Sequence, residues 1–114
     1  MAITEAYANT EAISTTEWSL TGDDGTIDTI TTDGVYQVFL DVSDMVSGDE
    51  LQIRIYEKVQ AADTQRIVYQ SNLVGPQSPP IWVSPSLVLM HGWDVTLDAI
   101  AGTITVTWSI RRVA

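Results

Sequence analysis

The chain has 114 residues, the size of one domain, and fifteen acidic against five basic residues give it a formal net charge of −10. This charge disfavours binding to nucleic acid or to anionic membranes, because like charges repel. The absence of cysteine excludes disulfides and thiolate metal sites, and no apolar run approaches the ~18 residues of a membrane helix. We therefore expect one soluble domain with no nucleic-acid partner and no membrane partner.

The N-terminal residues 1–17 are rich in Ala, Thr and Glu, and they include neither a basic region nor a hydrophobic block. No secretory signal is expected, and cytosolic assembly follows from that. The apolar residues Ile3, Tyr7 and Ile13 are too widely spaced for a strand face or a helical stripe, so we predict an arm. It is either a loosely ordered terminus or an extended arm that becomes ordered against a neighbouring subunit. Residues 18–114 are predicted to form the domain.

A turn-rich segment follows a short strand predicted at residues 16–20, and it contains Asp23, Asp24, Asp28 and Asp33. A calcium loop must be considered for so many aspartates, but the order of ligands in an EF-hand is missing. Asp-Gly pairs at residues 24–25 and 33–34 are strong turn signals. Solvated turn aspartates are therefore the favoured interpretation, and no metal site is predicted.

Three strands are predicted in the middle of the chain. Residues 35–41 are apolar on both faces, which is typical of a central strand. Residues 51–56 alternate between apolar and polar side chains, and residues 66–74 have β character as well. Because the connection between these two segments is short, we expect them to pair as a hairpin.

The proline-rich residues 75–80 favour a stiff connection that crosses between sheets. Residues 81–83 resume β character before Pro85 interrupts the ladder of hydrogen bonds. Leu87 and Leu89 then occupy odd positions, as Trp93 does. One strand could therefore continue through Gly92, which permits a bend.

The most regular pattern lies at the carboxyl end, where residues 93–98 and 103–110 both alternate strictly between apolar and polar side chains. Such alternation predicts an antiparallel hairpin lying on a core. Together with the upstream strands it predicts an all-β fold. We expect an antiparallel β-sandwich, jelly-roll-like or Greek key, of about seven or eight strands.

No set of residues suggests catalysis. The single histidine, His91, lies in a predicted strand, and neither a metal-ligand pattern nor a nucleophile elbow accompanies it. The acidic residues that a glycosidase would need fall mostly in turns, where acids are common. We therefore predict a protein that is not an enzyme and that has no cofactor, no catalytic residue and no metal ligand.

The four tryptophans divide into two pairs. Trp93 and Trp108 are in phase with the apolar faces of the last two strands, which favours core packing. Trp18 and Trp82 are less constrained, and either could stack on a sugar or anchor a protein interface. Adjacent prolines favour the interface. The predicted interface residues are Ile3, Tyr7, Ile13, Trp18, Pro79, Pro80 and Trp82.

Several segments resemble the small virion structural proteins of tailed bacteriophages, above all the capsid decoration or cement proteins. They are DGVYQVFLD at residues 33–41, GDELQIRIYEK at 48–58, HGWDVTL at 91–97, AGT at 101–103 and WSIRR at 108–112. The resemblance covers about residues 33–113 and rests on structural patterns with no catalytic signature. The N-terminal residues match least.

The resemblance implies a β-sandwich on the outer surface of the virion capsid that binds the major capsid protein, frequently as a homotrimer. It would be assembled in the cytoplasm of the bacterial host and would stabilise the expanded shell. Two other functions stay open. One is another virion component, such as a head-tail joining or tail protein, and the other is a carbohydrate-binding β-sandwich module.

Overall fold

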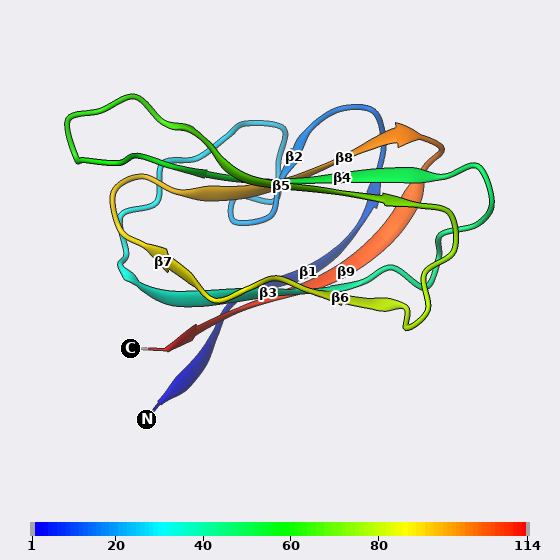
Figure 1. The fold of residues 1–114 in the computed structure, drawn as a ribbon, viewed down its shortest axis with the longest axis horizontal. Coiled ribbons are helices and arrows are strands. Elements are labelled where there is room, and N and C mark those ends of the chain that lie inside the picture. Colours follow the sequence, from blue (N-terminus) through cyan, green and yellow to red (C-terminus); the bar gives the residue numbers. More distant parts are fainter. Residues whose placement is uncertain (1, 114) are drawn as a thin grey trace.

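The computed structural model describes residues 2–113 as two antiparallel β-sheets packed face to face (Figure 1). One sheet contains β1 (Ile3–Ile13), β9 (Ile104–Val113), β3 (Gly34–Asp41) and β6 (Ile81–Val83) in this order, with β7 (Leu87–Leu89) also paired to β3. The second sheet contains β2 (Trp18–Ser19), β8 (Asp94–Ala101), β4 (Glu50–Glu57) and β5 (Arg66–Val74). The predicted all-β sandwich is confirmed. No helix within residues 2–113 is long and apolar enough to cross a membrane.

The core lies between the two sheets and is made by every second residue of the longer strands. The five-stranded sheet contributes Val38 and Leu40 from β3, and the four-stranded sheet contributes Ile53 from β4, all fully buried. Trp93 and Trp108 are the largest buried side chains. Their burial confirms the prediction that this pair packs in the core, and at about 1.5–3 kcal/mol for each large apolar side chain the core dominates the stability.

The structure corrects the predicted hairpin at the carboxyl end. β8 pairs with β2 and β4, whereas β9 pairs with β1 and β3, so the two strands belong to opposite sheets. Their apolar faces meet across the core instead of lying side by side, which satisfies the same alternation. The crossing uses Gly102 at φ +85°, where an added Cβ would also collide with the Asp49 carboxylate.

The predicted N-terminal arm is also corrected, because residues 3–13 form β1 and pair along their length with β9. A bulge between Glu5 and Tyr7 shifts the register, which a strict two-residue period does not allow for. After the bulge, Tyr7 and Ile13 face inward, but the position between them that pairs with Trp108 is the polar Asn9. This polar residue at the sheet margin hid the strand.

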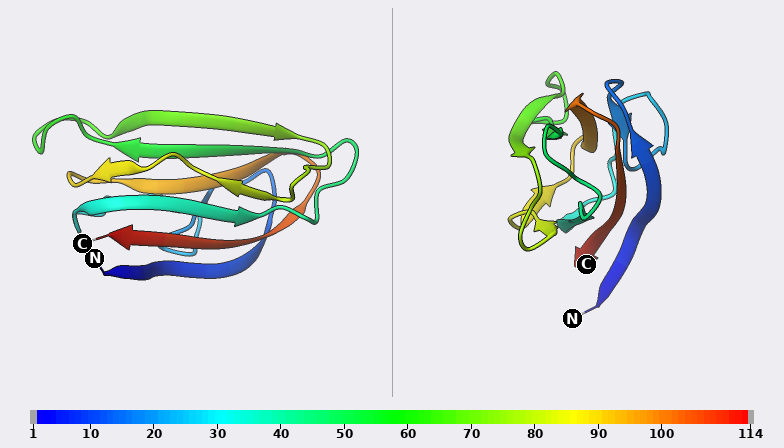
Figure 2. Two further views of the ribbon diagram at one scale, coloured as in Figure 1. Left: turned by 60° about the horizontal axis from the view of Figure 1, so that its bottom comes forward. Right: turned by 90° about the vertical axis from the view of Figure 1, so that its right-hand side faces the viewer.

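The connections were predicted with mixed success. β4 and β5 form the predicted hairpin, residues 75–80 cross from one sheet to the other, and β3 lies between β9 and β6 (Figure 2). The predicted continuous strand through Gly92 is wrong, because β7 and β8 belong to different sheets. Gly92 has φ +133°, and the Lys58 side chain packs where a Cβ would lie. The bend at Gly92 is therefore a change of sheet.

Leu40→Ala tests which face of β3 points into the core. Leu40 is fully buried, so its truncation should lower the free energy of unfolding by about 2–5 kcal/mol. Val74→Ala, at an exposed position in β5, should change it by less than about 0.5 kcal/mol. Urea unfolding followed by tryptophan fluorescence measures both values, and equal losses would contradict the assigned faces.

Candidate functional site

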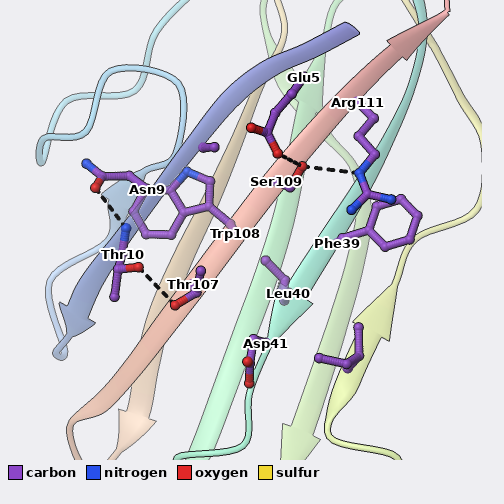
Figure 3. Close-up of a pocket in the computed structure, with 12 residues that line it drawn as sticks. Glu5, Asn9, Thr10, Phe39, Leu40, Asp41, Thr107, Trp108, Ser109 and Arg111 are labelled. Atoms are coloured by element: carbon purple, nitrogen blue, oxygen red, sulfur yellow. Dashed lines mark hydrogen bonds between the residues drawn. The ribbon is translucent and has the colours of Figure 1, made fainter. Parts of the chain in front are cut away.

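A shallow groove of about 470 Å³ crosses the outer face of the five-stranded sheet (Figure 3). Small side chains form its floor, namely Ala8 of β1 and Thr107 and Ser109 of β9. Phe39 of β3 and Ile81 of β6 form one wall, where the side chains are larger. The groove exists because β9 alternates large inward residues with small outward ones. We call this surface the docking face.

The side chains of the docking face are held in place by one another. The Arg111 guanidinium lies 3.8 Å from the centroid of the Phe39 ring, and Arg111 Nε donates a hydrogen bond to Ser109 Oγ at 3.2 Å. Ser109 Oγ in turn donates to Glu5 Oε2 at 2.6 Å. This chain of contacts links β3, β9 and β1 (Figure 3). An aromatic ring, a cation and a carboxylate are thus presented in fixed positions.

A polar cluster lies on the outer face of the other sheet, around Glu17. Tyr56 OH donates to Glu17 Oε2 at 2.6 Å, and the Thr96 hydroxyl donates to the same oxygen. Arg54 Nη1 lies 3.4 Å from Glu17 Oε1 and 3.8 Å from Asp98 Oδ1. The cluster ties the connection between β1 and β2 to β4 and β8.

Burial and hydrogen bonding oppose each other in this cluster. Burial acts to raise the pKa of Glu17, but hydrogen bonds from Thr96 and Tyr56 together with the Arg54 charge outweigh it, so the pKa is lowered. Burial and the bond to Glu17 raise the pKa of Tyr56 to about 12. Burial also raises the pKa of Asp98. Glu17 is therefore the carboxylate that the fold holds in its ionised form.

The turn-rich residues 20–33 are organised around Asp94, which is fully buried. Asp94 accepts hydrogen bonds from Thr21 Oγ1 at 2.7 Å and from the Asp28 backbone N–H at 2.8 Å. Burial raises the pKa of Asp94. Asp23 and Asp24 are exposed, as predicted for turn residues. Residues 2–113 contain no group of three or more histidine, aspartate or glutamate side chains that could hold a metal ion.

The predicted interface residues are not brought together. Ile3 is exposed at the start of β1, and β1 begins at the end of the sandwich where the termini lie (Figure 1). Pro79 and Pro80 are exposed in the connection between β5 and β6, which lies at the opposite end. Trp18 and Trp82 are only partly buried, and both pack against the core.

Two further predicted interface residues have structural roles. Tyr7 packs its ring edge-on to Trp93 at 6.0 Å between centroids. Ile13 is only 1% exposed, which contradicts its prediction as an interface residue.

The docking face is not predicted by the sequence patterns, although one signal of it is visible there. Residues 35–41 are apolar on both faces, which we interpreted as burial on both sides. In the structure Tyr36 and Leu40 face the core, but Val35 and Phe39 face outward, and Val35 is exposed. A strand that is apolar on both faces can therefore have one face on the core and the other exposed, and it need not be buried on both sides.

No protein-family model matches the chain, and no curated protein matches it in sequence. Solved structures share its fold. A chain from the disulfide-linked pili of Bacillus endospore appendages has a TM-score of 0.51 at 17% identity, covering 97% of this chain and 84% of that chain. PirA has a TM-score of 0.54 at 10% identity and covers 94% of each chain.

The Yersinia pseudotuberculosis-derived mitogen matches with a TM-score of 0.54 at 10% identity, covering 99% of this chain and 86% of that chain. Matches with TM-scores below 0.5 include cowpea mosaic virus empty particles, infectious bursal disease virus and two carbohydrate-binding domains. At these identities the likeness shows the fold alone.

Glu17→Gln tests the polar cluster. A lowered pKa means that Glu17 stabilises the fold above its unfolded pKa of about 4.3 and loses this effect as the pH falls through the folded value. Glu17 is 25% exposed, so we expect a loss of about 1–2 kcal/mol near pH 7 and a smaller loss near pH 3.

Urea unfolding of wild type and variant at both pH values gives this difference. The opposite effect of Asp94, which does not interact with Glu17, is the same in both proteins and cancels, whereas the raised pKa of Asp98 depends partly on the Glu17 charge and contributes to the difference. Tyr56→Phe removes one of the two hydroxyl donors to Glu17 and should show the same trend to a smaller degree. An equal loss at both pH values would refute the role of the Glu17 charge.

Proposed function

We propose that the protein is a non-enzymatic structural component of a virus particle, and specifically a decoration protein that binds the outer surface of a phage capsid. The observation that carries the proposal is the docking face, where aromatic, aliphatic and charged side chains are held in fixed positions on the outside of the five-stranded sheet. Its partner would be the major capsid protein. The resemblance of residues 33–113 to decoration proteins supports this choice of partner.

The shape and composition of the docking face suit a protein partner. Phe39 lies beside two exposed aliphatic residues of β6, Ile81 and Val83, which pair with Asp41 and Phe39 across the sheet. Aromatic residues and arginine are enriched at protein interfaces, and Arg111 stacks on the ring. Because these side chains are already fixed, binding costs little conformational entropy.

The distribution of charge is consistent with a position on the outside of a capsid. Of the charged side chains that line the docking face, Glu5 and Asp41 are acidic and Arg111 is basic, so this face has a charge of −1 on a chain whose total is −10. A protein bound through this face would direct most of its acidic groups to solvent and away from packaged DNA. The lack of cysteine agrees with assembly in a reducing cytosol.

Stabilisation of a shell does not require tight binding at one site. A ligand that binds only the expanded lattice stabilises that lattice by mass action, and the effect is repeated at every equivalent position. The molecule would therefore act by holding neighbouring capsid subunits together.

The experiment adds purified protein to undecorated heads and measures co-sedimentation and resistance to heat. Ile81→Glu places a carboxylate in the docking face and should weaken binding by more than about tenfold. Ile100→Glu, at the end of β8 in the other sheet, is the matched control and should bind as wild type does. Ile81 is 44% exposed and Ile100 is 49% exposed, so neither change should prevent folding.

Wild-type protein that neither sediments with heads nor raises their heat resistance would refute the proposal. Labelled protein found at one unique vertex, instead of all over the shell, would show a head-tail joining role instead.

A further inference from the structure

Both termini, β7 and the connection between β4 and β5 lie at one end of the sandwich (Figure 1). Exposed apolar residues of these segments form a second apolar surface. Its most exposed residues are Val59 at 83%, Val88 at 77% and Ile3 at 66%. Val35, Val68 and Met90 are also exposed there. We call these six residues the terminal patch.

The terminal patch combines protruding side chains with hollows. One hollow of about 350 Å³ is lined by Val59 and Val68, and another of about 410 Å³ is lined by Val35 and Met90. Val88 lines both hollows, so they form one continuous surface. Projections and depressions of similar size therefore lie side by side on the same molecule.

The charges around the terminal patch differ from those of the rest of the chain. Four of the five basic residues line its hollows or the adjoining ones, namely Lys58, Arg66, Arg111 and Arg112. Three acidic residues line the same hollows, namely Asp33, Glu57 and Asp63. Four positive and three negative side chains leave a local charge of +1 on a chain whose total is −10.

We propose that the terminal patch binds a second copy of this chain. Two copies of so acidic a protein repel each other over most of their surfaces, and this end, with its local charge of +1, is where that repulsion is weakest. A two-fold contact needs a surface that complements itself, with both signs of charge and both projections and hollows. The terminal patch has all of these features.

The other candidate occupants fit the charges less well. A basic partner would be attracted more strongly to the acidic surfaces elsewhere than to an end that carries four of the five cations. An anionic membrane would be repelled by the net charge. The strand β5 is at the free edge of its sheet, and its first residues lie at the patch. Of these residues, Val68 belongs to the patch and Ile67 is exposed beside it. Covering such an edge with another copy removes an exposed apolar strand from solvent.

Sedimentation equilibrium of the purified protein from about 1 μM to about 1 mM tests the proposal, since weak interfaces dissociate in this range. Wild type should show reversible self-association. Val88→Glu puts a carboxylate into the interface of both copies and should weaken association by at least about tenfold. Val46→Glu is the matched control, because Val46 is 60% exposed in the connection between β3 and β4 and the variant has the same net charge.

The proposal is overturned if wild type stays monomeric over the whole range, or if Val88→Glu associates as wild type does. Equal weakening by Val46→Glu would also overturn it, because general repulsion would then explain the effect. Flotation of a monomeric wild type with anionic vesicles would identify a membrane as the occupant instead. No heads are present in this assay, so self-association and capsid binding can fail independently.

Discussion

The packing of two tryptophans between the sheets is the interaction on which the rest of the structure depends. The Trp93 ring lies 4.4 Å from Tyr36 between centroids, and Trp108 is buried from the opposite sheet. Each indole N–H donates to a backbone carbonyl of the long connection between β2 and β3, Trp93 to Thr32 and Trp108 to Leu20. The same two side chains therefore join the sheets and fix both ends of that connection. With the core held in this way, the outer faces are rigid platforms.

The alternation of apolar residues predicted which side chains are buried, but it did not predict which strands are neighbours. Trp93, Val95 and Leu97 are fully buried as their period requires, and so is Val106 of β9. A period of two residues is satisfied equally by strands that lie side by side and by strands that face each other across a core. The choice between them depends on the turn at Gly102 and on pairings with distant strands, which no local pattern contains. The strand β1 was hidden for a different reason, because the bulge shifts its register and the polar Asn9 interrupts its apolar face.

The two proposed binding surfaces were harder to predict than the fold, because they combine residues far apart in the chain. The terminal patch brings Ile3, Val35, Val59 and Val88 together, and only the folded topology makes them neighbours. The docking face likewise depends on Phe39, whose outward direction is set by the register of β3 against β9. The sequence gives the net charge of the chain but does not show how the charged side chains are distributed over the folded surface. Their uneven distribution, which distinguishes one end of the molecule from the rest, is a property of the fold.

The pairing of Ile3 with Val113 brings the beginning of β1 and the end of β9 together at one end of the sandwich. Any tag or fusion partner joined to either end of the chain would emerge next to the terminal patch. Moving a tag from one terminus to the other would not relieve this crowding, whereas inserting it in the turn between β3 and β4 would place it at the far end. The position of a purification tag is thus a variable to control in any measurement of self-association.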